Sequence, residues 1–316
     1  MGSNRATAAI FVGLVGVAVA ALPAVAAAAR VAIVKSSSLA PFESALATLT
    51  ESLRAQPNQP EILTFDLGGD GANAPTIFRD VEAAQAQAVV TIGTLATEMA
   101  LQQTSTLPLI FSMVLYPEQS GFLRGHARSV TGVSLDIPFD VQFRFLRDLL
   151  PSAQRLGVLY HPSETGSIVD AGKAAAAKHG FDLRVRAVDK PADAVEALAG
   201  LLPEIDALWS VADSHVFTPQ TTPTLILNAL RRRVPLFGIS KSQARSGAVM
   251  ALYVDYGDIG RQTAELVVRV LEGERGEALP VASPRTVLLA LNERTAEHLG
   301  LTLAPQLRAA ATEVLQ

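Results

Sequence analysis

A glycine-containing turn carries the clearest candidate binding chemistry in the sequence. Residues 88–92 form an apolar run rich in β-branched side chains, which predicts a buried strand, and Gly93-Thr94 leads from it into a helical pattern. Glycine at such a turn lets a ligand approach the backbone closely. The first helical turn adds free N–H groups and the positive dipole end, beside the Thr94 and Thr97 hydroxyls. We predict a site for a carboxylate or another small anion; the alternative is an ordinary joint capped by Thr94.

Motifs for catalysis and cofactor binding are incomplete. The stretch Gly238-Ile239-Ser240-Lys241-Ser242 resembles a nucleophile elbow, G-x-S-x-G, but lacks the final glycine that the tight turn needs. No G-x-G-x-x-G follows the first expected strand, which argues against a dinucleotide. The histidines have no metal-ligand spacing, although His161 and His215 lie in loops that we expect to line a cleft. We therefore expect no enzyme activity, no cofactor and no metal.

Alternating strands and helices must position the glycine turn. In the first part of the chain, strands are expected at residues 31–34, 62–65, 88–92, 109–114 and 131–134, with helices at 39–53, 75–86 and 95–102. Such alternation is typical of a parallel sheet with helices on both faces.

The same alternation restarts after Pro151. Strands are expected at residues 156–160, 183–188, 207–211 and 235–239, and helices follow most of them. The remainder is too short for a third unit: a strand at 248–253, a helix at 256–271, a strand at 286–291 and a terminal helix at 304–315. We expect these pieces to return to the existing units.

The predicted fold is therefore α/β, with two doubly wound Rossmann-like lobes. Lobe 1 is expected to comprise residues 30–134 plus 249–281, and lobe 2 residues 135–248 plus 282–316. Ligands of open α/β sheets bind at the carboxyl ends of the strands, so the expected binding site is a cleft between the lobes.

Composition narrows the class of protein. A chain of 316 residues with 49% hydrophobic and 18% charged residues is expected to fold as a globule of two domains. The net charge of -4 gives no sign of a nucleic-acid partner. The absence of cysteine excludes disulfides, thiolate metal sites, cysteine catalysis and a lipid-anchored N-terminal cysteine.

The N-terminus resembles a secretory signal peptide. Residues 8–22 form a continuous apolar run after Arg5, and Pro23 ends it. Two Ala-x-Ala cleavage patterns follow before residue 30. We expect residues 1–29 to be a cleaved signal peptide and the mature protein to work in the periplasm.

Several short motifs follow one another in a fixed order along the chain. They are Val90-Thr91-Ile92-Gly93-Thr94-x-Ala96-Thr97, Val130-Thr131-Gly132-Val133-Ser134, Leu149-Leu150-Pro151, Leu156-Gly157-Val158-Leu159-Tyr160-x-Pro162-x-Glu164 with Ser167 after it, Asp213-x-x-Val216, Gly247-Ala248, Asp255-Tyr256-x-x-x-Gly260-Arg261-Gln262 and Leu299-Gly300-Leu301. Together they resemble the substrate-binding proteins of ABC transporters of the tryptophan/tyrosine-binding type.

The resemblance implies the type I periplasmic-binding-protein fold and a small amino-acid-like or aromatic carboxylate ligand between the lobes. It also implies delivery to an ABC permease in the inner membrane, by a chain we expect to be a monomer. Three residues depart from the family pattern: His161 and Ser214 replace asparagines, and Tyr116 replaces an aspartate. All three lie in or near cleft loops, which leaves the ligand's identity open.

Candidate contacts follow from this comparison. Gly93, Thr94 and Thr97 would receive a carboxylate, while Glu164 and Asp213 from the opposite lobe would pair with an ammonium group. A flat ligand would stack on Tyr116, Tyr160, Phe42 or His215. The other candidates are Ser36, Ser37, His161, Ser167 and Ser214. The alternatives are a solvated Glu164, an Asp213 that caps a helix, and core positions for Tyr160 and Phe42.

Two other functions remain open from the sequence. A periplasmic sensing module that feeds a membrane receptor or kinase would have the same fold and cleft. A hydrolase using Ser240 is the weaker alternative, because no base has the spacing to activate this serine.

Export predicts a processed N-terminus. Protein isolated from the native host should begin between Ala27 and Arg30, since signal peptidase cleaves after small residues at the end of the apolar run. Mass spectrometry of the intact protein measures this directly. A periplasmic form that retains Met1 would contradict the prediction.

Overall fold

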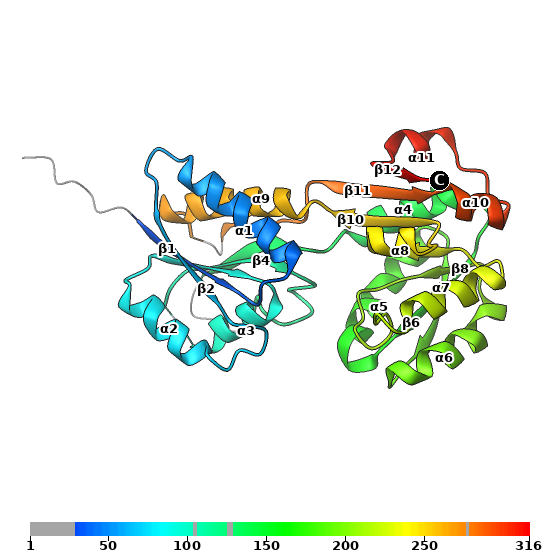
Figure 1. Ribbon diagram of the computed structural model, residues 1–316, viewed down its shortest axis with the longest axis horizontal. Helices are drawn as coiled ribbons and strands as arrows, with labels where there is room; N and C mark the ends of the chain where they lie inside the picture. Colours follow the sequence, from blue (N-terminus) through cyan, green and yellow to red (C-terminus); the bar gives the residue numbers. More distant parts are fainter. Residues whose placement is uncertain (1–28, 104–105, 125–128, 276–277) are drawn as a thin grey trace, which may run out of the picture.

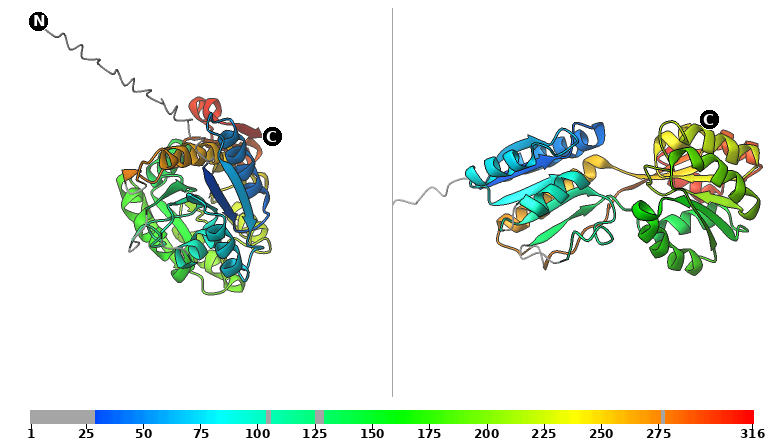
Figure 2. Two further views of the ribbon diagram at one scale, coloured as in Figure 1. Left: turned by 90° about the vertical axis from the view of Figure 1, so that its left-hand side faces the viewer. Right: turned by 90° about the horizontal axis from the view of Figure 1, so that it is seen from below.

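The computed structural model describes residues 29–103, 106–124, 129–275 and 278–316, which form two α/β lobes lying side by side (Figure 1, Figure 2). The segment expected to be a signal peptide, residues 1–29, lies outside the described residues except for Ala29. Within the described ranges, no helix combines the length and the apolar character that crossing a bilayer requires.

The first lobe is built on five parallel strands in the order β2-β1-β3-β4-β5. These strands are β1 (Arg30–Lys35), β2 (Glu61–Asp66), β3 (Ala88–Ile92), β4 (Leu109–Val114) and β5 (Val130–Ser134).

Helices cover both faces of this sheet because successive strand residues point to opposite sides. Val31 and Ile33 of β1 pack with α1 (Ala40–Arg54) and α9 (Tyr256–Leu271). Val34 packs on the other face, where the helices are α2 (Ala74–Ala83) and α3 (Thr94–Gln103). The lobe is therefore doubly wound, as the alternation predicted.

The second lobe is built on seven strands in the order β12-β11-β10-β9-β8-β6-β7, of which only the pair β10 and β11 is antiparallel. The strands are β6 (Arg155–Tyr160), β7 (Asp182–Ala187), β8 (Ala207–Trp209), β9 (Leu236–Gly238), β10 (Met250–Val254), β11 (Val287–Asn292) and β12 (Glu313–Leu315).

Two large hydrophobic clusters and one small one, made of Ala244, Ala251 and Ala290, fill the second lobe. Phe143 and Trp209 lie in the cluster under α4 (Phe139–Leu149) and α5 (Pro162–Lys178). The opposite face packs on α6 (Ala194–Leu201) and α7 (Thr222–Arg231). Shorter elements complete the lobe: η1 (Pro191–Asp193), η2 (Leu202–Glu204), α8 (Lys241–Arg245), α10 (Glu293–Leu299) and α11 (Pro305–Ala310).

The chain passes between the lobes three times, and Figure 2 shows these connections in its right-hand view. The first link follows β5, the second is Asp255 between β10 and α9, and the third leads from α9 to β11. In the third link, Ala282 still bridges to Val133 of the first sheet. The third link therefore stays paired with the first sheet before it enters the second lobe.

Residues 250–254 belong to the second lobe, although we expected them in the first. Residues 250–254 form β10, which pairs with β9 through Met250–Phe237 and along its length with β11. The expected lobe boundary at residue 249 is therefore wrong for this strand, and the chain crosses after Val254. The apolar pattern of a strand does not reveal which sheet supplies its hydrogen-bond partners.

The C-terminus also differs from the expected helix at residues 304–315. Helix α11 ends at Ala310, and Glu313–Leu315 adds β12 in parallel to β11. The exposed edge of β11 offers backbone groups that these last residues satisfy better than a further helical turn would.

Close packing of α1 on α9 joins the two distant parts of the chain that build the first lobe. A Cβ atom at Gly260 would lie 2.2 Å from the carbonyl oxygen of Ala45 and 2.2 Å from Thr48 Oγ1. Thr48 Oγ1 also donates a hydrogen bond of 2.8 Å to the carbonyl of Gly257. The helices therefore approach to a distance that only glycine permits.

We expect Gly260→Ala to lower the free energy of unfolding by about 1–3 kcal/mol, because the added methyl group forces the two helices apart. Gly200→Ala in α6 is the matched control, since a Cβ there meets nothing within 4 Å. The control should be neutral or more stable by up to about 1 kcal/mol, the helix preference of alanine over glycine. Urea unfolding measures both, and equal values for the two variants would contradict the close contact.

Candidate functional site

A cavity of about 540 Å³ lies between the lobes, where the links meet loops at the carboxyl ends of the strands. Its size falls in the range of about 300–1,000 Å³ that is typical of small-molecule sites. Much of its wall is apolar or aromatic: Leu115, Ile137, Phe217, Phe237, Ile239 and Tyr256. The polar groups that line it are therefore the ones able to orient a ligand.

Asp136 places a carboxyl group in this cavity that our sequence analysis missed. Both of its carboxylate oxygens accept the backbone N–H of Tyr116, at 2.8 Å each. Burial raises the pKa of Asp136 to about 7, although the hydrogen bond from Tyr116 opposes the rise. A cationic ligand group would favour the ionised form. An acidic residue at a predicted lobe crossover was the signal that could have identified it.

Tyr116, a predicted site residue, lies in the wall of the same cavity. Its ring stacks on Phe139, with centroids 6.0 Å apart and planes at 18°. Its φ of 49° lies in the left-handed region, which is unusual for a bulky residue. Burial, with the charge of Asp136, raises the pKa of its hydroxyl group. The Asp136 carboxyl group therefore holds Tyr116 in a strained backbone conformation at the cavity.

Asp213 is bonded within its own lobe. One carboxylate oxygen accepts from the backbone N–H of His161 at 2.6 Å and from Thr165 Oγ1 at 2.5 Å. The other accepts from the N–H groups of His215 at 2.9 Å and Val216 at 3.0 Å. The side chain is 3% exposed. The carboxylate lines the cavity, but the four hydrogen bonds that it accepts come from its own lobe, where they join two loops. Its expected pairing with an ammonium group stays a prediction.

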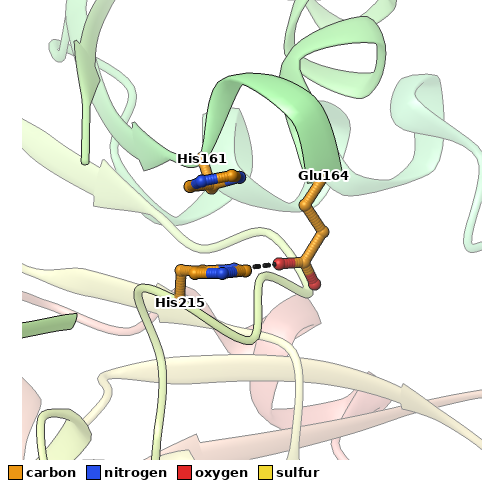
Figure 3. A group of neighbouring side chains, drawn as sticks. All are labelled: His161, Glu164 and His215. Atoms are coloured by element: carbon orange, nitrogen blue, oxygen red, sulfur yellow. Dashed lines mark hydrogen bonds and ion pairs between the residues drawn. The ribbon is translucent and has the colours of Figure 1, made fainter. Parts of the chain in front are cut away.

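Glu164 joins the same two loops a second time (Figure 3). One oxygen accepts from the Ser214 N–H at 2.9 Å, and the other contacts Ser214 Oγ at 3.0 Å and His215 Nδ1 at 2.7 Å. The rings of His161 and His215 stack with centroids 3.9 Å apart and planes at 14°. Of this group, Glu164 and Ser214 line the cavity.

The glycine turn lies at the carboxyl end of β3 in the first lobe, outside the wall of this cavity. Gly93 has a φ of 92°, and a Cβ there would lie 2.6 Å from Ser36 Oγ and 2.8 Å from the Phe42 ring. Ser36 Oγ accepts the Ala96 N–H at 3.0 Å and donates to the Ile92 carbonyl at 2.9 Å. Ser36 therefore already occupies one N–H group at the start of α3, next to the exposed Thr94.

Thr97 is not available to a ligand, contrary to our expectation. It is 0% exposed, and its hydroxyl donates to the Gly93 carbonyl at 3.0 Å and contacts Thr91 Oγ1 at 2.8 Å. A buried threonine one turn into a helix satisfies its hydroxyl on the preceding backbone. Thr97 therefore stabilises the turn.

The other predicted residues are spread around the strand ends. Tyr160 packs against the hydrophobic core of the second lobe, as the alternative interpretation expected. Ser167 is exposed on α5, and Ser37 is half-buried after β1. Ser240 lines the cavity, but its hydroxyl caps α8 by accepting the Gln243 N–H at 3.2 Å. Ser240 therefore has a structural role as the cap of α8 and not the alternative role of a nucleophile.

Ser210 is a second polar residue of the cavity that the sequence did not single out. Its Oγ atom is buried, and it has no hydrogen-bond partner among the residues that the structure describes. An unpaired buried hydroxyl is costly, which a ligand group or water can relieve. Asp136, Ser210 and the apolar walls together suit noncovalent binding of a small molecule with a cationic group and an apolar part.

The raised pKa of Asp136 predicts a specific pH dependence of stability. The folded state keeps this proton up to about pH 7, whereas the unfolded chain releases it near the ordinary pKa of 3.8. The folded state thus binds more protons in this interval, so the contribution of Asp136 to stability falls as the pH rises through it. The loss is at most about 1.4 kcal/mol per pH unit.

Urea unfolding of the wild type and Asp136→Asn at about pH 5 and about pH 8 measures this difference, because the asparagine does not titrate. The wild type should lose stability relative to the variant as the pH rises. A constant difference between the two proteins would contradict the raised pKa.

Comparison with known proteins places the chain in a family. The model of the ABC transporter substrate binding protein family matches residues 58–315. The chain is 24% identical to a tyrosine-binding protein of Clostridioides difficile over 218 residues, which are 67% of this chain and 63% of that protein. The matched region is thus less than two thirds of that relative's length.

Two solved structures share the architecture. The ligand-free, open structure of a substrate binding protein with adhesive properties from Clostridium difficile has a TM-score of 0.75 at 20% identity, covering 91% of this chain and 99% of that chain. The ABC domain from Streptococcus pneumoniae in complex with L-Trp has a TM-score of 0.68 at 23% identity, covering 90% and 100%.

These likenesses confirm the predicted fold of two lobes, the type I periplasmic-binding-protein architecture. The matched family consists of solute-binding proteins, in agreement with our prediction that the chain is not an enzyme. Because the family model matches most of its length, the chain belongs to the ABC transporter substrate-binding protein family.

Proposed function

We propose that this protein is an extracytoplasmic receptor that binds an amino acid between its lobes and delivers it to an ABC permease in the inner membrane. Family membership supports the transport role. The L-Trp in the streptococcal structure and the tyrosine-binding relative support an amino-acid ligand. The observation that carries the proposal is the cavity, which sets the Asp136 carboxyl group among apolar and aromatic side chains.

The ammonium group of the ligand would pair with Asp136. An ammonium ion favours the ionised carboxylate, and the hydrogen bond between them is strengthened by both charges. Ser210 Oγ, which is buried without a partner among the described residues, would complete the polar contacts. The ligand side chain would lie against Ile137, Phe217 and Tyr256, where apolar contact and ring stacking are available.

The carboxylate of the ligand would bind the glycine turn of the first lobe when the lobes close. The Thr94 hydroxyl and the first N–H groups of α3 lie at the strand end that faces the second lobe. Glu164 and Ser214 would approach from the opposite side, since both line the cavity. Closure about the three links would bring these two groups of residues together.

Delivery to a permease fits a chain that folds both lobes by itself. The cavity is formed within one chain, so we propose that the protein acts as a monomer. Residues 1–29 would direct it to the periplasm before they are removed.

Asp136→Asn should weaken the binding of L-tyrosine or L-tryptophan by roughly tenfold to a hundredfold, because the neutral amide loses a charge-assisted hydrogen bond. The affinity for deaminated analogues, which keep the ring and the carboxylate, should fall much less. Asp189→Asn, an exposed carboxyl group after β7, is the matched control and should leave both affinities unchanged. Isothermal titration calorimetry measures all of these.

Thr94→Ala completes the comparison. Because both kinds of ligand carry the carboxylate, the affinities for amino acids and for their deaminated analogues should fall by the same factor. Substitution of Gly93 is a poorer test, since any side chain there would overlap Ser36 and Phe42. Wild-type protein that binds no amino acid would refute the ligand class. An equal loss of both ligand types in Asp136→Asn would show that this residue holds the link and not the ammonium group.

A further inference from the structure

His161, Glu164 and His215 lie close together on the second lobe (Figure 3). Of the three, Glu164 also lines the cavity. Each offers one nitrogen or oxygen donor, and these three donor atoms lie within 4.8 Å of one another. In the part of the chain that the structure describes, this is the only such group of three. His161 precedes α5, Glu164 lies in its first turn, and His215 lies in the loop after β8.

The donor types select a class of ion. Imidazole nitrogen and carboxylate oxygen are the usual ligands of zinc and of neighbouring divalent transition metals. Calcium and magnesium prefer sites made of oxygen alone. Two imidazoles with one carboxylate also leave positions for water or a further ligand, the arrangement of open zinc sites.

The distances are close to those that an ion requires. Zinc holds nitrogen and oxygen at about 2.0–2.2 Å, so neighbouring donors in its sites lie about 3.0–3.5 Å apart. His215 Nδ1 and Glu164 Oε2 are already 2.7 Å apart and need to separate only slightly when an ion replaces the proton between them. The His161 ring, stacked 3.9 Å from that of His215, needs to tilt so that its lone pair converges with theirs.

The backbone that carries both histidines is fixed in place. The N–H groups of His161 and His215 both donate to the buried Asp213 carboxylate, at 2.6 and 2.9 Å. The backbone positions of the two histidines therefore do not depend on movement of the lobes, because Asp213 belongs to the same lobe. The His215 and Glu164 side chains are 41% and 31% exposed, so an ion can reach them from solvent.

We propose that His161, Glu164 and His215 form a binding site for one divalent transition-metal ion of the zinc class. The ion ties the loop before α5 to the loop after β8. Because Glu164 also lines the cavity, its open coordination positions lie at the edge of the ligand site. The site shares Glu164 with the wall of the amino-acid cavity, so its test uses the metal alone, with no amino acid present.

The test is calorimetric titration of Zn²⁺ into the mature, tag-free chain with no amino acid present. The wild type should bind one ion per chain, and Mg²⁺ should give no such binding. His161→Ala, His215→Ala and Glu164→Gln should each weaken the affinity by about tenfold or more. The controls are His298→Ala, an exposed histidine of the same lobe, and His179→Ala, which contacts Asp140 at 3.0 Å. Both controls should retain wild-type affinity.

X-ray absorption of the zinc-loaded protein gives a second readout, because it counts the imidazole ligands of the bound ion directly. It should show two imidazole ligands in the wild type and one after the change at His161 or His215. The proposal is overturned if the wild type binds no zinc, if the three variants bind it as tightly as the wild type, or if the controls lose it equally.

Discussion

The buried carboxylate of Asp213 is the interaction on which the binding face of the second lobe depends. Its two oxygens accept four hydrogen bonds, three of them from backbone N–H groups, and so join the loop after β6 to the loop after β8. A buried charge is tolerated only when it is fully hydrogen-bonded. The loop conformations that satisfy Asp213 also set the positions of His161, His215 and Glu164. Asp213 thus shapes this face of the cavity through the loops that it joins.

The link between the lobes imposes a second constraint, and it produces the cavity chemistry. The chain leaves β5 through residues 135–137, which line the cavity where the lobes meet. Asp136 lies there with few polar partners, so burial raises its pKa to about 7. The same apolar surroundings that disfavour its charge would make a cationic ligand group its best partner. If the proposed ligand contacts Asp136, the link that connects the lobes would couple binding to lobe movement.

Much of the fold could be predicted because the local signals were strong. The apolar runs of β3 and β4 are buried on both faces, so composition alone identified them as strands of a parallel sheet. The predictions failed where the hydrogen-bonding partner of a strand decides which sheet it joins. Residues 250–254 have the same pattern in either lobe, and the pairing with β9 and β11 assigns them to the second. Residues 313–315 became a strand only because the edge of β11 was available.

The candidate site likewise contains residues that the sequence predicted and residues that only the structure revealed. The sequence by itself determined the glycine turn after β3, because glycine with a φ of 92° is a local requirement of a strand-to-helix joint. It also placed Tyr116, Glu164 and Ser214 at strand ends, where ligands of α/β proteins bind. Only the tertiary structure decided that Asp213 and Thr97 bond inward, that His161 meets His215, and that Asp136 is buried in a cavity. Hydrogen-bond partners, burial and pKa depend on groups far away in the chain, and a linear sequence does not bring those groups together.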